Sequence, residues 1–254
     1  MSRVFITGST TGLGLAAGQM LMAAGHEVIL HARSSERARA LASVAPRAAG
    51  VVIGDLADMT QTRAVAEQVN RLGRMDAVIH NAGVYGGPER DSAPAGHPPT
   101  LAVNVIAPYL LCALMARPDR LVFLSSSMHR GVRPALDDVD WIRRPWHPDR
   151  AYAESKLLLT ALAFSLARRW PAIQVNAVDP GWVPTRMGGP QATDDLAQGH
   201  QTQAWLAVSD APEALVSGVY WFHQAPQPPA PQALDHGFQD QLMSTLATLT
   251  GIAI

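Results

Sequence analysis

Short segments that are apolar at consecutive positions recur along this sequence, and they restrict its fold more than any other feature. Strands have this composition when both of their faces are buried, which is typical of a parallel sheet covered by helices on both sides. We predict strands over 3–7, 27–31, 50–54, 76–80, 120–125, 173–178 and 218–223, and helices near 13–24, 35–45, 60–72, 100–117 and 152–169. The alternation of strands and helices predicts a doubly wound α/β sandwich of about seven strands.

The chain has 254 residues, which is enough for the core of one such domain, and no boundary between two domains is visible. We therefore expect a single domain over residues 1–254. Two stretches depart from the alternation, namely 130–150 and the Pro/Gln-rich segment 224–232, which we expect to be a stiff surface connection. Within the C-terminal extension 224–254, apolar residues at helical spacing predict an amphipathic helix that covers the core.

Composition excludes several classes of function. The chain has 20 basic and 21 acidic residues with no long basic run, which argues against nucleic-acid binding. The single cysteine, Cys112, lies in an apolar run and is expected in the core, and the nine histidines lack the spacing of a zinc site. No signal-peptide pattern opens the chain, and no apolar stretch is long enough to cross a membrane. We expect a cytoplasmic protein without a metal.

Glycines at positions 8, 12 and 14 separate the first predicted strand from the first predicted helix. In this setting backbone amides and a helix N-terminus commonly hold a pyrophosphate. Gly8 would make the turn, Gly12 would let the backbone approach a nucleotide, and Gly14 would allow close helix packing or leave room for a nicotinamide. Thr10, Thr11 and Leu13 belong to the same predicted contact. The alternative is a tight turn without a ligand.

The end of the second predicted strand indicates which dinucleotide would bind. An acidic residue at this place holds the adenine ribose, whereas an arginine accepts a 2′-phosphate. Here Ala32 stands at the acidic position and Arg33 follows it, with Ser34 and Arg37 close by. This arrangement favours NADP over NAD. Alternatively, the two arginines are solvated charges at the start of a helix.

Tyr152 and Lys156 stand four residues apart at the start of a predicted helix, so their side chains share one face. A nearby ammonium group would stabilise a phenolate and lower the pKa of the tyrosine, which would make it an acid/base near neutral pH. Taken alone, this spacing is common on helix surfaces.

Together with other motifs, the pair resembles the short-chain dehydrogenase/reductase family, in its short single-domain branch. The resemblance covers about residues 3–223 and rests on "TGSTTGLG", "GDL" at 54–56, "HNAG" at 80–83, "VNV" at 103–105, the serines at 125–127, "YAESK" and "DPGWVPT" at 179–185. It implies a Rossmann fold and an oxidoreductase. The motif "SSSMH" and the C-terminal segment further resemble retinol-dehydrogenase-like members.

The resemblance implies a set of contacts to the cofactor. Asp55 and Leu56 would line the adenine pocket, while Asn81, Ala82 and Gly83 would pass beside the ribose, with Asn81 also bracing the central strands. Pro180 and Gly181 would lie beneath the nicotinamide, and Val183 and Thr185 would complete the site. The alternatives for these residues are Asx turns, strand-end caps and packing glycines.

The resemblance also implies the catalytic roles. Tyr152 would donate a proton to a carbonyl oxygen as hydride arrives, or accept one in the reverse reaction. Lys156 would bind the nicotinamide ribose and lower the tyrosine pKa, and Asn104 would hold a water that links Lys156 to solvent. Ser126 would stabilise the developing negative charge, with Ser127 as the second choice, whereas Ser125 would end the strand.

The chain departs from the usual pattern by a long gap of 26 residues between Ser126 and Tyr152, so the segment 130–150 is expected to loop out. Residues near 186–208 would form a lid over a small carbonyl or alcohol substrate, with a hydrophobic one as the working guess. The family commonly pairs through the helix that carries the Tyr/Lys motif, so we expect a homodimer or homotetramer.

Other functional classes explain less of the sequence. A non-catalytic NADP-binding regulator would keep the glycine turn and Arg33 but would not need Asn104, Ser126, Tyr152 and Lys156 together. A nucleotide-sugar epimerase usually has a different glycine turn and a larger substrate domain. A methyltransferase would share only the first turn.

Overall fold

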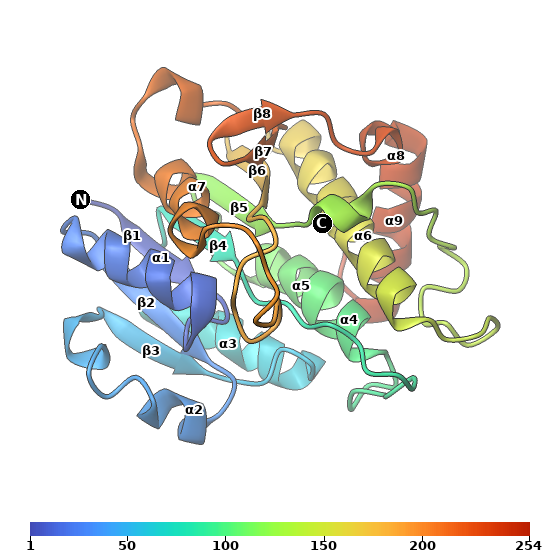
Figure 1. Ribbon diagram of the computed structural model, residues 1–254, viewed down its shortest axis with the longest axis horizontal. Coiled ribbons are helices and arrows are strands. Elements are labelled where there is room, and N and C mark those ends of the chain that lie inside the picture. Colours follow the sequence, from blue (N-terminus) through green and yellow to red (C-terminus); the bar gives the residue numbers. More distant parts are fainter.

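The computed structural model describes all residues from 1 to 254, and its eight strands form one sheet in the order β3-β2-β1-β4-β5-β6-β7-β8 (Figure 1). The strands are β1 (Arg3–Ile6), β2 (Glu27–Ala32), β3 (Gly50–Ile53), β4 (Ala77–His80), β5 (Arg120–Leu124), β6 (Gln174–Asp179), β7 (Tyr220–Phe222) and β8 (Ala225–Gln227). All neighbours pair in parallel except β7 and β8, which are antiparallel. The strand order reverses between β1 and β4, which confirms the predicted doubly wound fold.

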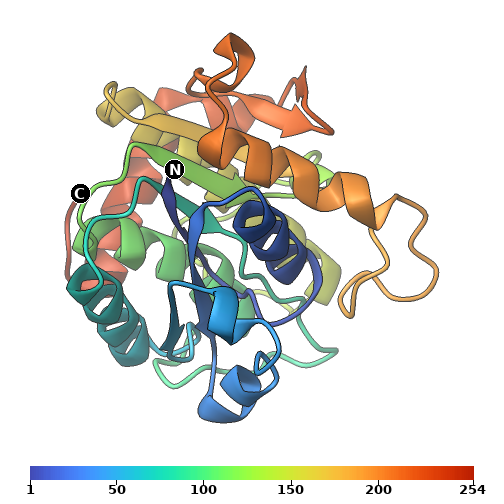
Figure 2. The same ribbon diagram turned by 90° about the vertical axis from the view of Figure 1, so that its left-hand side faces the viewer.

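Helices cover both faces of the sheet. They are α1 (Gly12–Ala23), α2 (Ser35–Arg39), α3 (Met59–Arg71), α4 (Pro99–Leu101), α5 (Ala107–Leu114), α6 (Pro148–Arg169), α7 (Leu196–Val208), α8 (Pro231–Leu234) and α9 (His236–Thr250), with short turns η1 (Ala45–Arg47), η2 (Ala102–Ile106), η3 (Ser127–His129) and η4 (Pro212–Ala214). Helices α1 and α7 lie side by side on one face, while α3, α5 and α6 cover the other (Figures 1 and 2).

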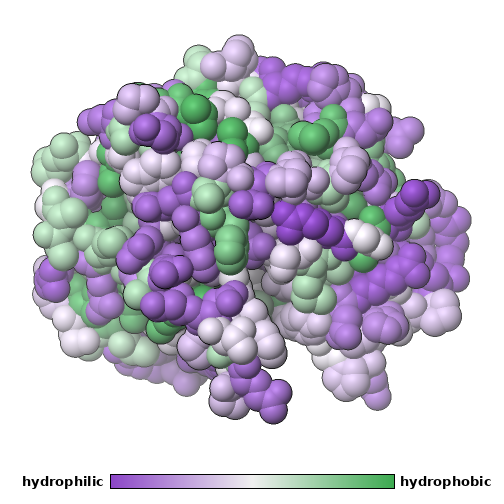
Figure 3. All heavy atoms as spheres, turned by 45° about the horizontal axis from the view of Figure 1, so that its top comes forward, coloured by the Kyte–Doolittle hydropathy of each residue, from purple (hydrophilic) through white to green (hydrophobic).

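The two faces of the sheet carry two separate apolar cores. Successive side chains of a strand point to opposite faces, so Val4 and Ile6 join the core beneath α1 and α7, whereas Phe5 joins the core beneath α3, α5 and α6. This explains why β1 is apolar at consecutive positions. The outer surface in Figure 3 mixes hydrophobic and hydrophilic residues, with the hydrophobic ones in small groups.

The predicted strands lie within a residue or two of the observed ones, but strand β8 was not predicted. It falls inside the segment 224–232, which was expected to be a connection, and it includes Pro226 opposite Trp221 of β7. Proline is tolerated here because β8 is an exposed edge strand with no further neighbour to bond. The three residues are too few to show a pattern in the sequence.

The helix predicted over 100–117 is interrupted. Residues Ala102–Ile106 form a π-helical turn between α4 and α5. Pro108 has no N–H group and cannot donate to the carbonyl four residues earlier, at Asn104, so a regular α-helix is broken at this place. The predicted helix over 35–45 is also shorter than expected, because α2 ends at Arg39.

The segment 186–208, predicted as a lid, is only partly a loop. From Leu196 onward it is α7, whose Ala204, Leu206 and Ala207 are buried in the core beside α1. This part of the expected lid is therefore packed against the core in the structure. The irregular part spans residues 182–195 and projects beyond the end of the sheet (light orange in Figure 2). None of the helices is both long and apolar enough to cross a bilayer.

Candidate active site

Strands β1, β4, β5 and β6 are parallel neighbours, so the loops that follow them open at the same edge of the sheet. These loops carry the glycine turn, the segment after His80, the serines after Leu124 and the turn after Asp179. The carboxyl edge beside a reversal of strand order is where open α/β sheets bind ligands. Motifs that are up to about 170 residues apart in the chain therefore meet here.

The glycine turn has the geometry that a close backbone approach requires. Gly8 and Gly12 have φ of 64° and 59°, in the left-handed region that favours glycine. A Cβ atom on Gly8 would lie 2.9 Å from the Cα of Ala82, and a Cβ on Gly14 would overlap the side-chain amide of Asn81. Gly14 thus serves close packing between α1 and the loop after β4, which is one of its two predicted roles.

Asn81 and Ala82 fix this packing. The side-chain amide of Asn81 donates to the carbonyl oxygens of Thr7 and Gly8, at 2.9 and 3.1 Å. The backbone amide of Ala82 donates to Oγ1 of Thr7 at 3.0 Å. The predicted bracing role of Asn81 is therefore visible as hydrogen bonds between the ends of β1 and β4.

His31 is a functional-site residue that the sequence reasoning missed. Its Nδ1 accepts a hydrogen bond from the amide of Gly8 at 2.9 Å, so its Nε2 carries the proton and donates to the carbonyl of Gly54, also at 2.9 Å. Burial lowers the pKa of His31 below its usual value, which keeps the ring neutral. The ring thereby connects the glycine turn to the "GDL" loop.

The N-terminus of α1 is open to an anion. Its N-cap residue, Thr11, makes no side-chain capping bond, and the first turn holds no acidic residue. The first amides of a helix have no partner within the helix, and they carry the positive end of its dipole. Gly12 also lies beside Thr185, whose Cγ2 would be 3.5 Å from a Cβ at position 12. The turn and the loop after β6 thus flank one site.

The adenine side of this site carries a basic residue and no acidic one at the end of β2. Arg33 is exposed and forms no ion pair, while Ala32 is buried. Ser34 caps α2 by accepting from the amide of Arg37 at 3.3 Å. Asp55 accepts from the amide of Ala57 at 2.9 Å, which is an Asx turn.

Two predicted contact residues have side chains in the interior. Leu56 is 5% exposed and belongs to the core, and Val183 is 4% exposed and packs against Gly199 of α7. Only their backbones remain available to a ligand. Gly181, in contrast, has φ of 83° and lies in the turn directly after β6, where its amide donates to the Oδ1 atom of Asp179 at 3.0 Å.

Tyr152 and Lys156 lie on consecutive turns of α6 and face the end of β5. The ammonium group of Lys156 donates to the carbonyl of Leu124 at 2.7 Å and lies 5.6 Å from the centre of the Tyr152 ring. Both side chains are buried, with Tyr152 8% and Lys156 4% exposed. The pair is therefore held by the fold at the edge of the sheet where the loops meet.

The three adjacent serines are distinguished by their surroundings. Ser125 is buried and its hydroxyl pairs with that of Thr160 at 2.7 Å, while Ser127 is exposed at the start of η3. Ser126 is half-buried, its Oγ accepts from the amide of Met128 at 3.3 Å, and its hydroxyl acts to lower the pKa of Tyr152 against the effect of burial. The geometry thus favours Ser126 over Ser127.

Asn104 lies in the π-helical turn with its side chain fully buried. Its Oδ1 accepts from the amide of Val84 at 2.8 Å, and its amide donates to the carbonyl of Val84 and to the hydroxyl of Ser155. The space above Gly83 is bounded by Asn104 Oδ1 and Lys156 Nζ, which lie 3.6 and 3.3 Å from a Cβ built on this glycine. Asn104 and Lys156 therefore line the same small region.

The expected net lowering of the Tyr152 pKa is outweighed by burial in this structure. Burial raises the pKa of Tyr152 to about 12, and the carboxylate of Asp179 adds to this rise. Burial also lowers the pKa of Lys156 to about 8, against the effect of Asp179. Both shifts arise because the interior disfavours the charged form of each group. Tyr152 therefore keeps its proton at neutral pH.

An aromatic ring stacks on Tyr152, and exposed apolar side chains occur in the loops at this edge of the sheet. The ring of Tyr85 stacks on that of Tyr152 with centroids 4.5 Å apart, and Tyr85 is 40% exposed. Met128, Trp182 and Met187 are likewise exposed and come from the loops after β5 and β6. Exposed apolar groups that gather beside a polar site indicate a surface for an apolar ligand. Tyr85 lies outside the recognised sequence motifs, so this contact was not predicted.

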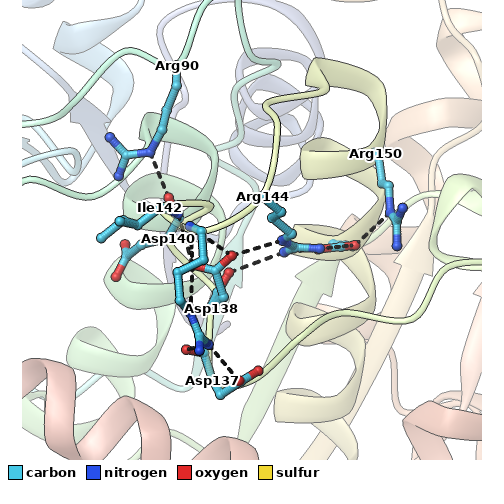
Figure 4. Close-up of polar contacts among 9 residues, drawn as sticks. Arg90, Asp137, Asp138, Asp140, Ile142, Arg144 and Arg150 are labelled. Atoms are coloured by element: carbon cyan, nitrogen blue, oxygen red, sulfur yellow. Dashed lines mark hydrogen bonds and ion pairs between the residues drawn. The ribbon is translucent and has the colours of Figure 1, made fainter.

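The segment 130–150 loops out, as expected, and returns to α6 through ion pairs (Figure 4). The guanidinium of Arg144 donates twice to the carboxylate of Glu154, at 2.8 and 2.6 Å, and stacks on Trp141. Arg150 donates to the same carboxylate at 3.0 Å, and Asp138 lies 3.4 Å from Arg144. Glu154 stands between Tyr152 and Lys156, so the insertion is anchored on the helix that carries the catalytic pair.

The chain is similar in sequence to known dehydrogenases and reductases. A family model described as enoyl-(acyl carrier protein) reductase matches residues 8–222. The short-chain dehydrogenase chyC of Penicillium rubens is 38% identical, with 100% of this chain and 99% of the relative covered. Human retinol dehydrogenase 13 is 28% identical over 98% of this chain and 84% of its own length.

Solved structures share the fold. An uncharacterised protein from Mycobacterium paratuberculosis is 25% identical and superposes with a TM-score of 0.84 over 100% of this chain and 94% of its own. A blue fluorescent protein from a metagenomic library, solved with NADPH, is 24% identical with a TM-score of 0.71 over 87% of this chain and 95% of its own.

Proposed function

Since the chain belongs to the short-chain dehydrogenase/reductase family, we propose that it is an NADP-dependent oxidoreductase that interconverts a carbonyl compound and its alcohol. The observation that carries this proposal is the meeting of Ser126, Tyr152 and Lys156 beside the uncapped N-terminus of α1. A proton donor and an anion site at one sheet edge are the two elements that hydride transfer from a dinucleotide requires.

The residues at this edge fit a dinucleotide. The free amides of α1, the positive φ of Gly8 and Gly12 and the exposed Arg33 suit a pyrophosphate and a ribose phosphate. We assign the phosphates to Gly8, Thr10, Thr11, Gly12, Leu13 and Gly14, the adenosine end to Arg33, Ser34, Asp55 and Leu56, and the nicotinamide end to Asn81, Ala82, Gly83, Tyr152, Lys156, Pro180, Gly181, Val183 and Thr185. Leu56 and Val183 would contribute backbone only.

When bound, the nicotinamide supplies the hydride that reduces the carbonyl carbon, or accepts it in the reverse direction. Tyr152 donates its phenolic proton to the carbonyl oxygen, and the hydroxyl of Ser126 donates a hydrogen bond to the same oxygen. The charge of Lys156, held by the carbonyl of Leu124, stabilises the phenolate that remains. Asn104 holds the loop at Val84 against α6, beside the space that a proton-relaying water would fill.

The preference for NADP rests on the end of β2. An acidic residue there would repel a 2′-phosphate, and the chain has Ala32 instead, followed by an unpaired arginine. The related fold solved with NADPH is consistent with this choice, although its likeness concerns the fold alone.

We further propose a hydrophobic ketone as the substrate class. Its apolar part would lie against Tyr85 and the exposed methionines 128 and 187, while its oxygen reaches Tyr152 and Ser126. One Streptomyces relative, 31% identical, bears the name of a candidate daunorubicin C-13 ketoreductase. In this arrangement the loop 182–195, which includes Trp182 and Met187, would act as the lid.

The expected homo-oligomer stays a prediction. Helix α6 is buried within one chain from Ala151 to Leu166, and α9 packs along it (yellow and red in Figure 1). A second copy could pair through α6 only if α9 moved away, so any dimer of this chain would use another face.

The test is consumption of NADPH by the purified protein with a panel of aldehydes and ketones, with NADH in parallel and Tyr152→Phe as the control. Turnover that needs Tyr152 supports the proposal. Tight nucleotide binding without turnover of any carbonyl would instead favour a non-catalytic NADP-binding regulator, and failure to bind either nucleotide would overturn both functions.

A further inference from the structure

His129 connects the loop that carries Ser126 to the C-terminal extension. The ring is 0% exposed, and both of its nitrogens are bonded. Nδ1 lies 2.7 Å from the carbonyl oxygen of Ser126, and Nε2 lies 2.9 Å from the backbone amide of Ala230, which is 101 residues further along the chain. No other side chain contacts the backbone of Ser126 through a hydrogen bond.

These two contacts fix the protonation of the ring. A backbone amide can only donate, so Nε2 accepts from Ala230 and Nδ1 must carry the proton that goes to Ser126. Burial lowers the pKa of His129 to about 4, so the ring is neutral at physiological pH. The donor that faces Ser126 is therefore permanent under working conditions.

The carbonyl of Ser126 is fully engaged. It accepts from the backbone amide of His129 at 3.0 Å as well as from the ring, so both of its lone pairs are used. Ser126 precedes η3 with extended φ and ψ of −166° and 149°. The ring bond thus acts on the backbone of the proposed catalytic serine, at the point where the chain leaves β5.

Buried residues of β7 and of the C-terminal extension fix the position of the His129 ring. His129 packs on Tyr220 of β7 with centroids 4.7 Å apart, and the hydroxyl of Tyr220 donates to Asp179 at 3.2 Å. Ala230 is buried directly before α8, whose Ala233 belongs to the core. The ring therefore has one position, defined by β7 and by the extension.

We propose that His129 is a positioning residue of the active site, which sets the place of Ser126 relative to Tyr152 and makes that place depend on the C-terminal extension. The proposal rests on the oxidoreductase function above. A displacement of a reacting group by about 1 Å can cost about a hundredfold in rate. If the His129 ring no longer held the carbonyl of Ser126, the hydroxyl of Ser126 would therefore support catalysis poorly even in a folded protein.

Two substitutions separate the two bonds of the ring. In His129→Asn the side-chain amide reaches about as far as Nδ1 and keeps a donor for Ser126, whereas in His129→Gln the longer amide reaches toward Ala230. We expect His129→Asn to keep kcat within about threefold and His129→Gln to lower it at least about tenfold, with the Kd for NADPH unchanged in both. Arg63→Met is the matched control, because Arg63 also bonds to the C-terminal extension, at the carbonyl of Thr250, without contact to Ser126, His129 or Tyr220.

A double-mutant cycle distinguishes positioning from general stability. If His129 acts through Ser126, His129→Gln causes no further loss of kcat when it is added to Ser126→Ala. Equal losses of kcat in the presence and absence of the Ser126 hydroxyl would overturn the proposal, as would full activity of His129→Gln.

A second measurement is independent of turnover. Long-range ¹⁵N–¹H NMR of the histidine rings, assigned with His129→Asn, should show a neutral ring protonated on Nδ1 between pH 6 and 8. A proton on Nε2 would overturn the proposal whether or not the enzyme reduces carbonyls. If the wild-type chain turns over no carbonyl compound but His129 shows the expected tautomer, the proposed function fails, and with it the catalytic role of His129.

Discussion

The ring of Tyr85 lies on the ring of Tyr152 at 4.5 Å between centroids, so an exposed aromatic side chain directly adjoins the buried proton donor. The hydroxyl of Tyr85 points away from the site, since it donates to Asp149 at 2.9 Å. The part of Tyr85 that remains for a substrate is therefore its apolar ring. This relationship places an apolar surface next to the position proposed for the carbonyl oxygen.

Removal of that ring should affect large substrates selectively. We expect Tyr85→Ser to lower kcat/KM for a bulky aryl ketone by about tenfold, since an aromatic contact and its buried area contribute about 1.5 kcal/mol. The value for butanone should change by less than about twofold. Tyr85→Phe loses only the bond to Asp149 and should behave as the wild type. Equal losses for both ketones would mean that Tyr85 does not contact the substrate.

The pH dependence of reduction should report on Lys156. Tyr152, with a pKa of about 12, stays protonated over the usual range, whereas Lys156, with a pKa of about 8, loses its charge as the pH rises. The charge that stabilises the phenolate is thus present below pH 8 and lost above it. We expect kcat/KM for ketone reduction to be level from pH 6 to 7 and to fall above about pH 8, as measured by initial rates in the free-enzyme regime. A profile that rises up to pH 10 would show that deprotonation of Lys156 is harmless.

Arg33 should determine the choice of cofactor. Loss of a charge-assisted hydrogen bond to a phosphate costs about 1.5 to 3 kcal/mol, so Arg33→Ala should raise the Kd for NADPH by about tenfold to a hundredfold. The Kd for NADH, which lacks the 2′-phosphate, should stay within about twofold. Arg39→Ala, at the exposed end of α2, the helix that follows Arg33, is the control. Calorimetric titration with each nucleotide measures both Kd values. An equal rise in the two would contradict the assignment of Arg33 to the 2′-phosphate.

The two arginines that bind Glu154 should contribute unequally to the free energy of unfolding. Arg144→Met leaves the 3% exposed carboxylate of Glu154 with one partner, and we expect a loss of about 3 kcal/mol in the free energy of unfolding. Arg150 is 55% exposed, so Arg150→Met should cost at most about 1 kcal/mol. Urea unfolding followed by circular dichroism measures both. Similar values for the two variants would mean that the bidentate pair has no special role.

Most of the fold could be predicted because it rests on local patterns. Consecutive apolar residues in segments such as 3–7 and 120–125 are typical of strands that are covered on both faces, and this pattern was visible in the sequence. Strand β8 and the π-helical turn at Asn104 could not be predicted, since the first has three residues and the second depends on tertiary contacts to Val84 and Ser155.

The positions of the candidate site residues could be predicted better than the pKa values of their side chains. Spacing placed Tyr152 beside Lys156, but only the structure shows that burial dominates the pKa of each. Glu154 stood inside the recognised motif, yet its partner Arg144 comes from the insertion. Likewise, the contacts of His129 could not be predicted, because its bond to Ala230 spans a sequence distance over which no periodicity extends.

The proposed reaction is a hydride transfer from NADPH to a ketone, with Tyr152 as the proton donor. It is tested with NADPH deuterated at the transferable position and mass spectrometry of the alcohol formed from an aryl ketone. We expect one deuterium per product molecule with the wild-type chain and a loss of product by at least about a hundredfold with Tyr152→Phe. Product without deuterium, or equal labelled product from Tyr152→Phe, would contradict it.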